Sequence, residues 1–276
     1  MSDTIVFKGQ INDPPRSSWL GAVVLIGIIA ALAVTQVLSG SWNTRAVGAT
    51  ILMLPLAIAS KSIYTVHCNL LVLFVLFRSL TNFFPHFANY PFNYLTGLVL
   101  YAYAVVLIPE LRGTVGWLRL GKFGAKTWML LAAIIIVSGA ALMNWVHEDN
   151  PDLSRYSGMA PKLPLWGTLI YGLGFSAFNA ALEEITWRGV MMEALDSALG
   201  AGYWTLIIQA LSFGVAHYRS GFPNGIDGSV MTFAYGLILG FIRRKSRGML
   251  ACWMAHVAAD STVFCLIVSF IHGSAK

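Results

Sequence analysis

Long apolar stretches separated by short polar breaks dominate the chain from Trp19 to the C-terminus. A helix that crosses a bilayer needs about 17–25 mainly apolar residues, and stretches of this kind recur along the sequence. We expect helices at about 19–38, 46–59, 62–84, 92–108, 127–146, 164–195, 203–218, 229–242 and 248–271. The pattern predicts an all-α fold, namely a polytopic transmembrane helical bundle of about eight helices, with a range of seven to nine.

The distribution of polar residues and motifs divides the chain into three expected regions. Residues 1–18 are polar and form an N-terminal tail, and residues 19–160 carry transmembrane helices without a recognisable motif. Residues 161–272 hold the motifs described below and are the expected catalytic core. Within this core, Gly236-x-x-x-Gly240 would let two helices approach closely.

The composition supports membrane insertion and argues against nucleic-acid binding. Hydrophobic residues make up 57% of the chain and charged residues only 11%, so nothing suggests a separate soluble domain. The net charge of +6 arises in short loops between apolar segments. Membrane topology explains such loop charges better than a nucleic-acid partner does. We therefore expect a multi-pass integral membrane protein that is surrounded by lipid and binds no nucleic acid.

Several ionisable side chains nevertheless fall inside apolar segments, in the three motifs Glu183-Glu184-x-x-x-Arg188, Phe213-x-x-x-His217 and His256-x-x-x-Asp260. Each ionisable group costs roughly 2.5–3.5 kcal/mol at the bilayer centre, so their presence indicates a chemical role. Glu184 and Arg188 are four residues apart, share a helix face and can pair. Glu183 points about 100° away, which leaves its carboxylate suited to act as a general base.

Each histidine motif has a non-catalytic interpretation when it is taken alone. His217 lies one helical turn after Phe213, where an interfacial histidine is common. His256 lies one turn before Asp260 in the last apolar segment, where the pair could be a polar contact between helices. The three motifs on successive helices are more informative together and predict one site.

In this order and setting, the motifs resemble those of the CPBP family of intramembrane proteases. This family includes the type II CAAX prenyl endopeptidases and bacterial bacteriocin-processing relatives. The resemblance covers Leu182 to Asp260, and Gly189 directly after Arg188 also fits it. It implies glutamate-dependent hydrolysis of a membrane-associated protein or peptide, with no metal and no other cofactor. It also favours the bacterial cytoplasmic membrane as the location.

The resemblance further implies a role for each residue of the motifs. Glu183 would activate a water molecule that His217 helps to position, and His256 with Asp260 would stabilise the oxyanion. Glu184, Arg188 and Phe213 would support the site. This chain departs from the prenyl-protein members, which carry Asn at the position of Asp260. An ionised aspartate donates no hydrogen bond, so we expect Asp260 either to be protonated or to orient His256 as the donor.

The depth of the site is an open question at the level of sequence. Straight and complete spans would place Glu183 and His217 about 20 Å apart at 1.5 Å per residue, too far for joint catalysis. Either the glutamate helix continues to about Leu195 and lies deeper in the membrane, or the helix at 203–218 is only partly inserted.

Other classes of protein remain as alternatives. A zinc protease could use the two histidines with carboxylates, although no HExxH occurs and His147-Glu148 is followed by Asp149-Asn150-Pro151. A serine protease could use Ser176 with His256 as its base. Outside enzymes, the same residues could line an ion pathway in a transporter, or the chain could be a non-catalytic chaperone or immunity protein on the same scaffold.

Overall fold

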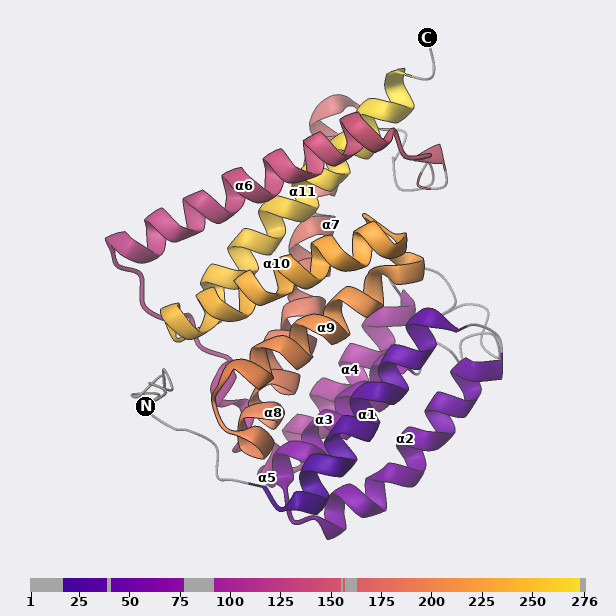
Figure 1. Cartoon of the computed structure of the whole chain (residues 1–276), viewed down its shortest axis with the longest axis vertical. Coiled ribbons are helices and arrows are strands. Elements are labelled where there is room, and N and C mark those ends of the chain that lie inside the picture. The colour runs from indigo at the N-terminus through magenta and orange to yellow at the C-terminus, as the bar shows by residue number, and fades with distance from the viewer. Residues whose placement is uncertain (1–16, 39–40, 77–91, 155, 157–162, 274–276) are drawn as a thin grey trace, which may run out of the picture. The chain divides into compact units, whose positions relative to one another are not determined.

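The computed structural model describes residues 17–38, 41–76, 92–154, 156 and 163–273, and these residues form helices without any strand (Figure 1). The predicted all-α class is therefore confirmed. The N-terminal helices are α1 (Trp19–Val37), α2 (Ser41–Ala59), α3 (Ile63–Leu76), α4 (Phe92–Leu107), α5 (Pro109–Arg112) and the 3-10 helix η3 (Val115–Trp117). The later helices are α6 (Ala125–Asp149), α7 (Leu165–Glu184), the π-helix η5 (Ile185–Met191), α8 (Met192–Leu199), α9 (Tyr203–Ser220), α10 (Gly225–Ser246) and α11 (Leu250–Gly273).

Five helical segments within the described residues are long and apolar enough to cross a membrane: Trp19–Val37, Ala125–Asp149, Leu165–Leu199, Gly225–Ser246 and Leu250–Ile271. A sixth candidate consists of Leu95–Leu107 and Pro109–Trp117, which are bent by 102° at the break between them. These spans confirm a multi-pass membrane protein. The expected total of about eight would also require helices such as α2, α3 and α9 to span, and it stays a prediction.

The helix that carries the glutamates continues further than expected and changes its winding on the way. The segment Leu165–Leu199 is helical over 35 residues, whereas the sequence predicted an end near Leu195. Its α-helical winding stops at Glu184, and seven residues of π-helix follow before α8. Glu183 and Glu184 thus lie near the middle of a long segment. Single-turn π-helical insertions in α-helices are frequent at functional sites.

The chain forms two compact units. Unit 1 comprises residues 1–118 and 185–240, and unit 2 comprises residues 119–184 and 241–276. Each unit contains part of the expected catalytic core at 161–272, and most of the expected tail at 1–18 lies outside the described residues. The three-region division from the sequence stays a prediction.

Unit 1 is built around α1 and α3, each of which packs against several other helices. Helix α1 contacts α2, α3, α8 and α9, and it buries Leu25, Ile28 and Leu32 on one face at helical spacing. The expected close approach at Gly236-x-x-x-Gly240 is confirmed in this unit. A Cβ atom at Gly236 would lie 3.1 Å from the Cα atom of Ala210 on α9.

Unit 2 is built around α11, which packs against both α6 and α7. A Cβ atom at Gly172 of α7 would lie 2.3 Å from the ring of Phe264 on α11, so this glycine forms a notch for the ring. The turn before α11 is joined to the segment before α6 by backbone bonds. Lys122 N donates to Ser246 O over 2.6 Å, and Met249 N donates to Arg119 O over 2.8 Å. The backbone bonds anchor the start of α11 near α6, and the contact of Gly172 with Phe264 packs α11 against α7, the two helices that carry the predicted acidic residues.

Candidate active site

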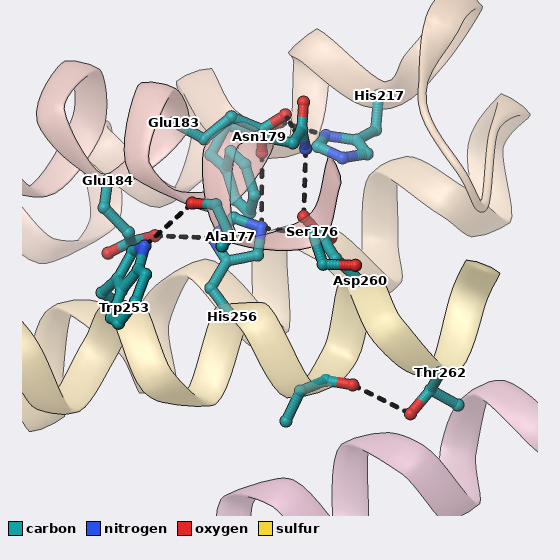
Figure 2. Close-up of polar contacts among 12 residues, drawn as sticks. Ser176, Ala177, Asn179, Glu183, Glu184, His217, Trp253, His256, Asp260 and Thr262 are labelled. Atoms are coloured by element: carbon teal, nitrogen blue, oxygen red, sulfur yellow. Dashed lines mark hydrogen bonds and ion pairs between the residues drawn. The ribbon is translucent and has the colours of Figure 1, made fainter. Parts of the chain in front are cut away.

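Four of the predicted site residues come together in unit 2, where α7 packs against α11 (Figure 2). Glu183 and Glu184 occupy the last two positions of α7. His256 and Asp260 lie one turn apart on α11 and therefore share a helix face. Helix packing brings residues more than 70 positions apart in the sequence into contact.

His256 meets a different glutamate at each of its two ring nitrogens. Its Nδ1 lies 2.8 Å from Glu184 Oε1, which is the distance of a strong hydrogen bond. Its Nε2 lies 3.4 Å from Glu183 Oε2 and 3.6 Å from Asp260 Oδ1. Glu184 therefore sets the orientation of the ring and directs Nε2 towards the other two carboxylates.

The exposure of the three carboxylates separates them into two kinds. The side chain of Glu184 is 1% exposed, whereas those of Glu183 and Asp260 are 22% and 17% exposed. A buried carboxylate needs a charged or donating partner, and His256 supplies one to Glu184. The more accessible Glu183 and Asp260 are the carboxylates that a water molecule or a substrate could reach.

The other three predicted residues lie together in unit 1. The guanidinium carbon of Arg188 is 4.2 Å from the centroid of the Phe213 ring, a cation–π contact. The ring of Phe213 also contacts that of His217, with 4.7 Å between the centroids. The predicted ion pair between Glu184 and Arg188 stays a prediction, since the structure places Glu184 against His256 and Arg188 against Phe213.

The tautomer of His217 follows from its backbone contact. Nδ1 lies 3.1 Å from the carbonyl oxygen of Phe213, which can only accept a hydrogen bond. Nδ1 therefore carries the proton, and Nε2 is the acceptor in the neutral ring. A neutral His217 can accept a hydrogen bond from a water molecule at Nε2.

The helices that carry these residues fall within a region that matches a known protein family. Residues 165–262 match the family model of the type II CAAX prenyl endopeptidase Rce1-like proteins. These residues form a domain of that family. No curated protein and no solved structure matches the chain. The expected resemblance is confirmed over this range, which includes all seven predicted site residues.

Membership of this endopeptidase family implies a peptidase that acts on a protein substrate. The match begins at the first residue of α7 and ends within α11, so it includes both helices of the acidic cluster. It crosses from unit 2 into unit 1 and back again. The N-terminal helices α1 to α6 lie outside the matched range.

Asn179 contacts two of the predicted site residues, and the sequence did not reveal it. Its Nδ2 donates to Glu183 Oε1 over 3.3 Å and to Asp260 Oδ2 over 3.1 Å (Figure 2). Asn179 precedes Glu183 by four residues in a mainly apolar helix, and this spacing is the signal that could have identified it. Its second contact, with α11, was not visible without the fold.

Two of the alternative site chemistries can be compared with the described residues. The hydroxyl of Ser176 donates to the backbone carbonyl of Gly172 over 2.8 Å, one turn back in α7. This bond directs the hydroxyl along its own helix. Among the residues that the structure describes, no group of three or more His, Cys, Asp or Glu is arranged to hold a metal ion.

Proposed function

We propose that this chain is an intramembrane endopeptidase in which Glu183 activates the attacking water molecule without the help of a metal. The observation that carries the proposal is the contact between the partly exposed Glu183 carboxylate and Nε2 of His256, inside a domain of an endopeptidase family. The substrate is a protein or peptide associated with the same membrane, because the domain lies in a multi-pass membrane chain.

In the proposed reaction, Glu183 takes a proton from water while the water oxygen attacks the carbonyl carbon of the scissile peptide. The electron pair of the carbonyl bond moves to oxygen and forms an oxyanion. Nε2–H of His256 donates to this oxyanion, an interaction worth roughly 2.7–4 kcal/mol in other hydrolases. Glu183 then passes its proton to the leaving amine as the C–N bond breaks.

The remaining residues assist this reaction in the proposal. Glu184 accepts from Nδ1 of His256 and so keeps Nε2 directed at the reacting centre. Nε2 of His217 accepts a hydrogen bond from the second O–H group of the water molecule. Asp260 acts in its ionised form, as a charged acceptor that supports His256.

The test compares the purified full chain in liposomes with its Glu183→Gln variant. We expect the wild type to cleave and Glu183→Gln to lose about 10²–10⁴-fold in rate, the usual contribution of a general base. Glu148→Gln is the matched control, because Glu148 is exposed at the end of α6. Undiminished cleavage by Glu183→Gln would contradict the proposed mechanism.

Two further measurements distinguish the alternatives. A chelator that abolished cleavage, with recovery on addition of zinc, would support a zinc protease instead. Ion flux in the same liposomes that persisted in Glu183→Gln would support a transporter. Comparison of N-terminal peptides from cells that express the wild type or Glu183→Gln would identify the substrate. Paired peptides with and without a prenyl group would show whether the lipid is recognised.

A further inference from the structure

The amide of Asn179 connects the two helices at the proposed reacting centre. It donates to Glu183 on its own helix and to Asp260 on α11, over 3.3 and 3.1 Å. An ionised carboxylate can only accept hydrogen bonds, so the NH₂ group, and not the amide oxygen, must face both acids. The chemistry of the two neighbours thus defines the orientation of the amide.

Asn179 and His256 together enclose the two carboxylates. Oε1 of Glu183 faces Asn179, and Oε2 of the same carboxylate faces Nε2 of His256. Oδ2 and Oδ1 of Asp260 divide in the same way between Asn179 and His256. The four side chains form a closed ring in which two donors alternate with two acceptors. The shortest contact in this ring is the one between Asn179 and Asp260.

His256 alone is a weak constraint on Glu183. Its Nε2 is 3.4 Å from Glu183 and 3.6 Å from Asp260, at or beyond the usual range of a hydrogen bond, and the contact of Asn179 with Glu183 is only slightly shorter at 3.3 Å, so the orientation of Glu183 depends on both donors. Two carboxylates this close repel each other strongly where the dielectric is low. A group that donates to both without adding charge reduces the repulsion and restricts the Glu183 side chain. Asparagine suits this position, because its NH₂ carries two donors.

We propose that Asn179 is a positioning residue of the peptidase site, which holds Glu183 in its reacting orientation by bridging it to Asp260. This inference rests on the proposed function. Asn179 acts through Glu183 and does not itself contact the reacting atoms. Its loss should lower kcat and leave KM nearly unchanged, because substrate binding does not depend on the orientation of the base.

An exchange of the two side chains separates this role from that of a simple connection between helices. Asn179→Asp removes the donor and adds a third negative charge beside Glu183 and Asp260. The double variant Asn179→Asp/Asp260→Asn restores one amide and one carboxylate between α7 and α11. It still places a carboxylate instead of an amide beside Glu183. Stability should therefore recover in the double variant, whereas catalysis should not.

The experiment measures kcat, KM and the melting temperature of the full chain in liposomes or detergent. We expect Asn179→Asp to lower kcat about 10–100-fold, as for a lost hydrogen bond to a charged group, and to lower the melting temperature. The double variant should melt near the wild-type temperature but keep a kcat at least about tenfold below that of Asp260→Asn alone, which accounts for the role of Asp260 itself. Asn150→Asp is the matched control for kcat, since Asn150 is exposed at the end of α6.

Asn179→Ala is the second variant, in case the added charge prevents folding. It should lower kcat about tenfold without adding a charge. Recovery of both kcat and melting temperature in the double variant would overturn the assignment and leave Asn179 as a connection between helices. Wild-type kcat in Asn179→Ala, or a change in KM alone, would overturn it as well. A wild-type chain without any cleavage would instead refute the proposed function, and the positioning role with it.

Discussion

Two buried histidines, one in each unit, show how differently this protein treats the same side chain. His67 on α3 of unit 1 is 2% exposed, and His256 on α11 of unit 2 is 3% exposed. Both ring nitrogens of His67 meet hydroxyl groups, Nδ1 that of Thr114 and Nε2 that of Tyr101. Both ring nitrogens of His256 meet carboxylates.

The partners of His67 define a neutral chain of hydrogen bonds. Thr114 Oγ1 donates to the carbonyl oxygen of Leu111 over 2.7 Å, so it accepts from Nδ1–H of His67. Nε2 of His67 then accepts from the hydroxyl of Tyr101. The chain connects α3 and α4 with the segment that follows α5. It satisfies a buried histidine without any charge, which is sufficient for a structural role.

The carboxylates around His256 cost more free energy to bury than a structural role for this histidine requires. Three carboxylates approach one imidazole in a segment that is apolar enough to cross a membrane. Buried ion pairs often stabilise a protein no better than apolar residues of the same volume. The difference between the two histidines teaches that burial alone does not identify a reactive group. The charge of the partners and the exposure of Glu183 separate the two cases.

The clearest test of this comparison makes the same substitution at each histidine. The largest expected effect is on the rate of cleavage in the His256 variant. We expect His256→Gln to lower the rate of cleavage about 10²–10³-fold, because a glutamine side chain cannot donate hydrogen bonds to Glu184 and to the oxyanion at the same time. His67→Gln should remain within about threefold of the wild type per folded molecule, since the reaction does not use this residue. Initial rates normalised to the folded fraction would measure both variants. A tenfold loss in well-folded His67→Gln would contradict the comparison.

A second test concerns the packing that brings α7 to α11 in unit 2. Gly172→Ala should destabilise the protein by about 1–3 kcal/mol, because the new methyl group would overlap the ring of Phe264. Gly174→Ala is the control on the same helix, where a Cβ atom would meet nothing within 4 Å. Thermal unfolding in detergent measures both. Adding Phe264→Leu to Gly172→Ala should restore part of the lost stability. Equal melting temperatures of the two alanine variants would contradict the inference that Gly172 makes room for the Phe264 ring.

A smaller effect should follow from Tyr101→Phe in unit 1. This variant leaves Nε2 of His67 without its donor, at a cost of about 1–2 kcal/mol in the free energy of unfolding. Tyr103→Phe is the matched control, because the Tyr103 side chain is 63% exposed on the same helix. Unfolding measurements should show the loss only at position 101. An equal loss at both positions would show that the bond to His67 contributes nothing specific.

The smallest effect is expected at Trp253 on α11. Its Nε1 donates to the carbonyl oxygen of Ala177 over 3.0 Å. Trp253→Phe should destabilise the protein by less than about 1 kcal/mol, because a backbone carbonyl inside a helix keeps its helical donor. Trp166→Phe on α7 is the control, since Trp166 is 69% exposed. A loss as large as that of Gly172→Ala would show that this bond is a main connection between the helices.

The positions of the helices were predictable, because hydrophobic length determines them directly. The expected helix at 19–38 is α1 (Trp19–Val37), and the one at 248–271 is α11 (Leu250–Gly273). The π-helix at Ile185–Met191 was not predicted, nor was the bend of 102° after α4. Apolar periodicity reports which residues leave water, and it does not distinguish α-helical from π-helical winding or a straight span from a bent one.

The contact between Glu184 and His256 shows the limit of reasoning from spacing. The sequence paired Glu184 with Arg188, because residues four apart share a helix face. That pairing stays a prediction, and the structure adds a contact of Glu184 with His256, which lies 72 positions away on another helix. Local spacing defines the side of a helix from which a residue projects. It does not determine which helix packs against that side.

By itself, the sequence determined the all-helical, multi-pass class and singled out the ionisable residues of the proposed site. Both follow from the cost of placing polar groups in lipid, which is a property of each residue and its neighbours in the chain. Only the tertiary structure decided that Glu184 meets Nδ1 and Glu183 meets Nε2 of one histidine, and that Asn179 bridges Glu183 to Asp260. These contacts depend on the packing of α11 against α7, and residues so distant in sequence carry no periodic signal of each other.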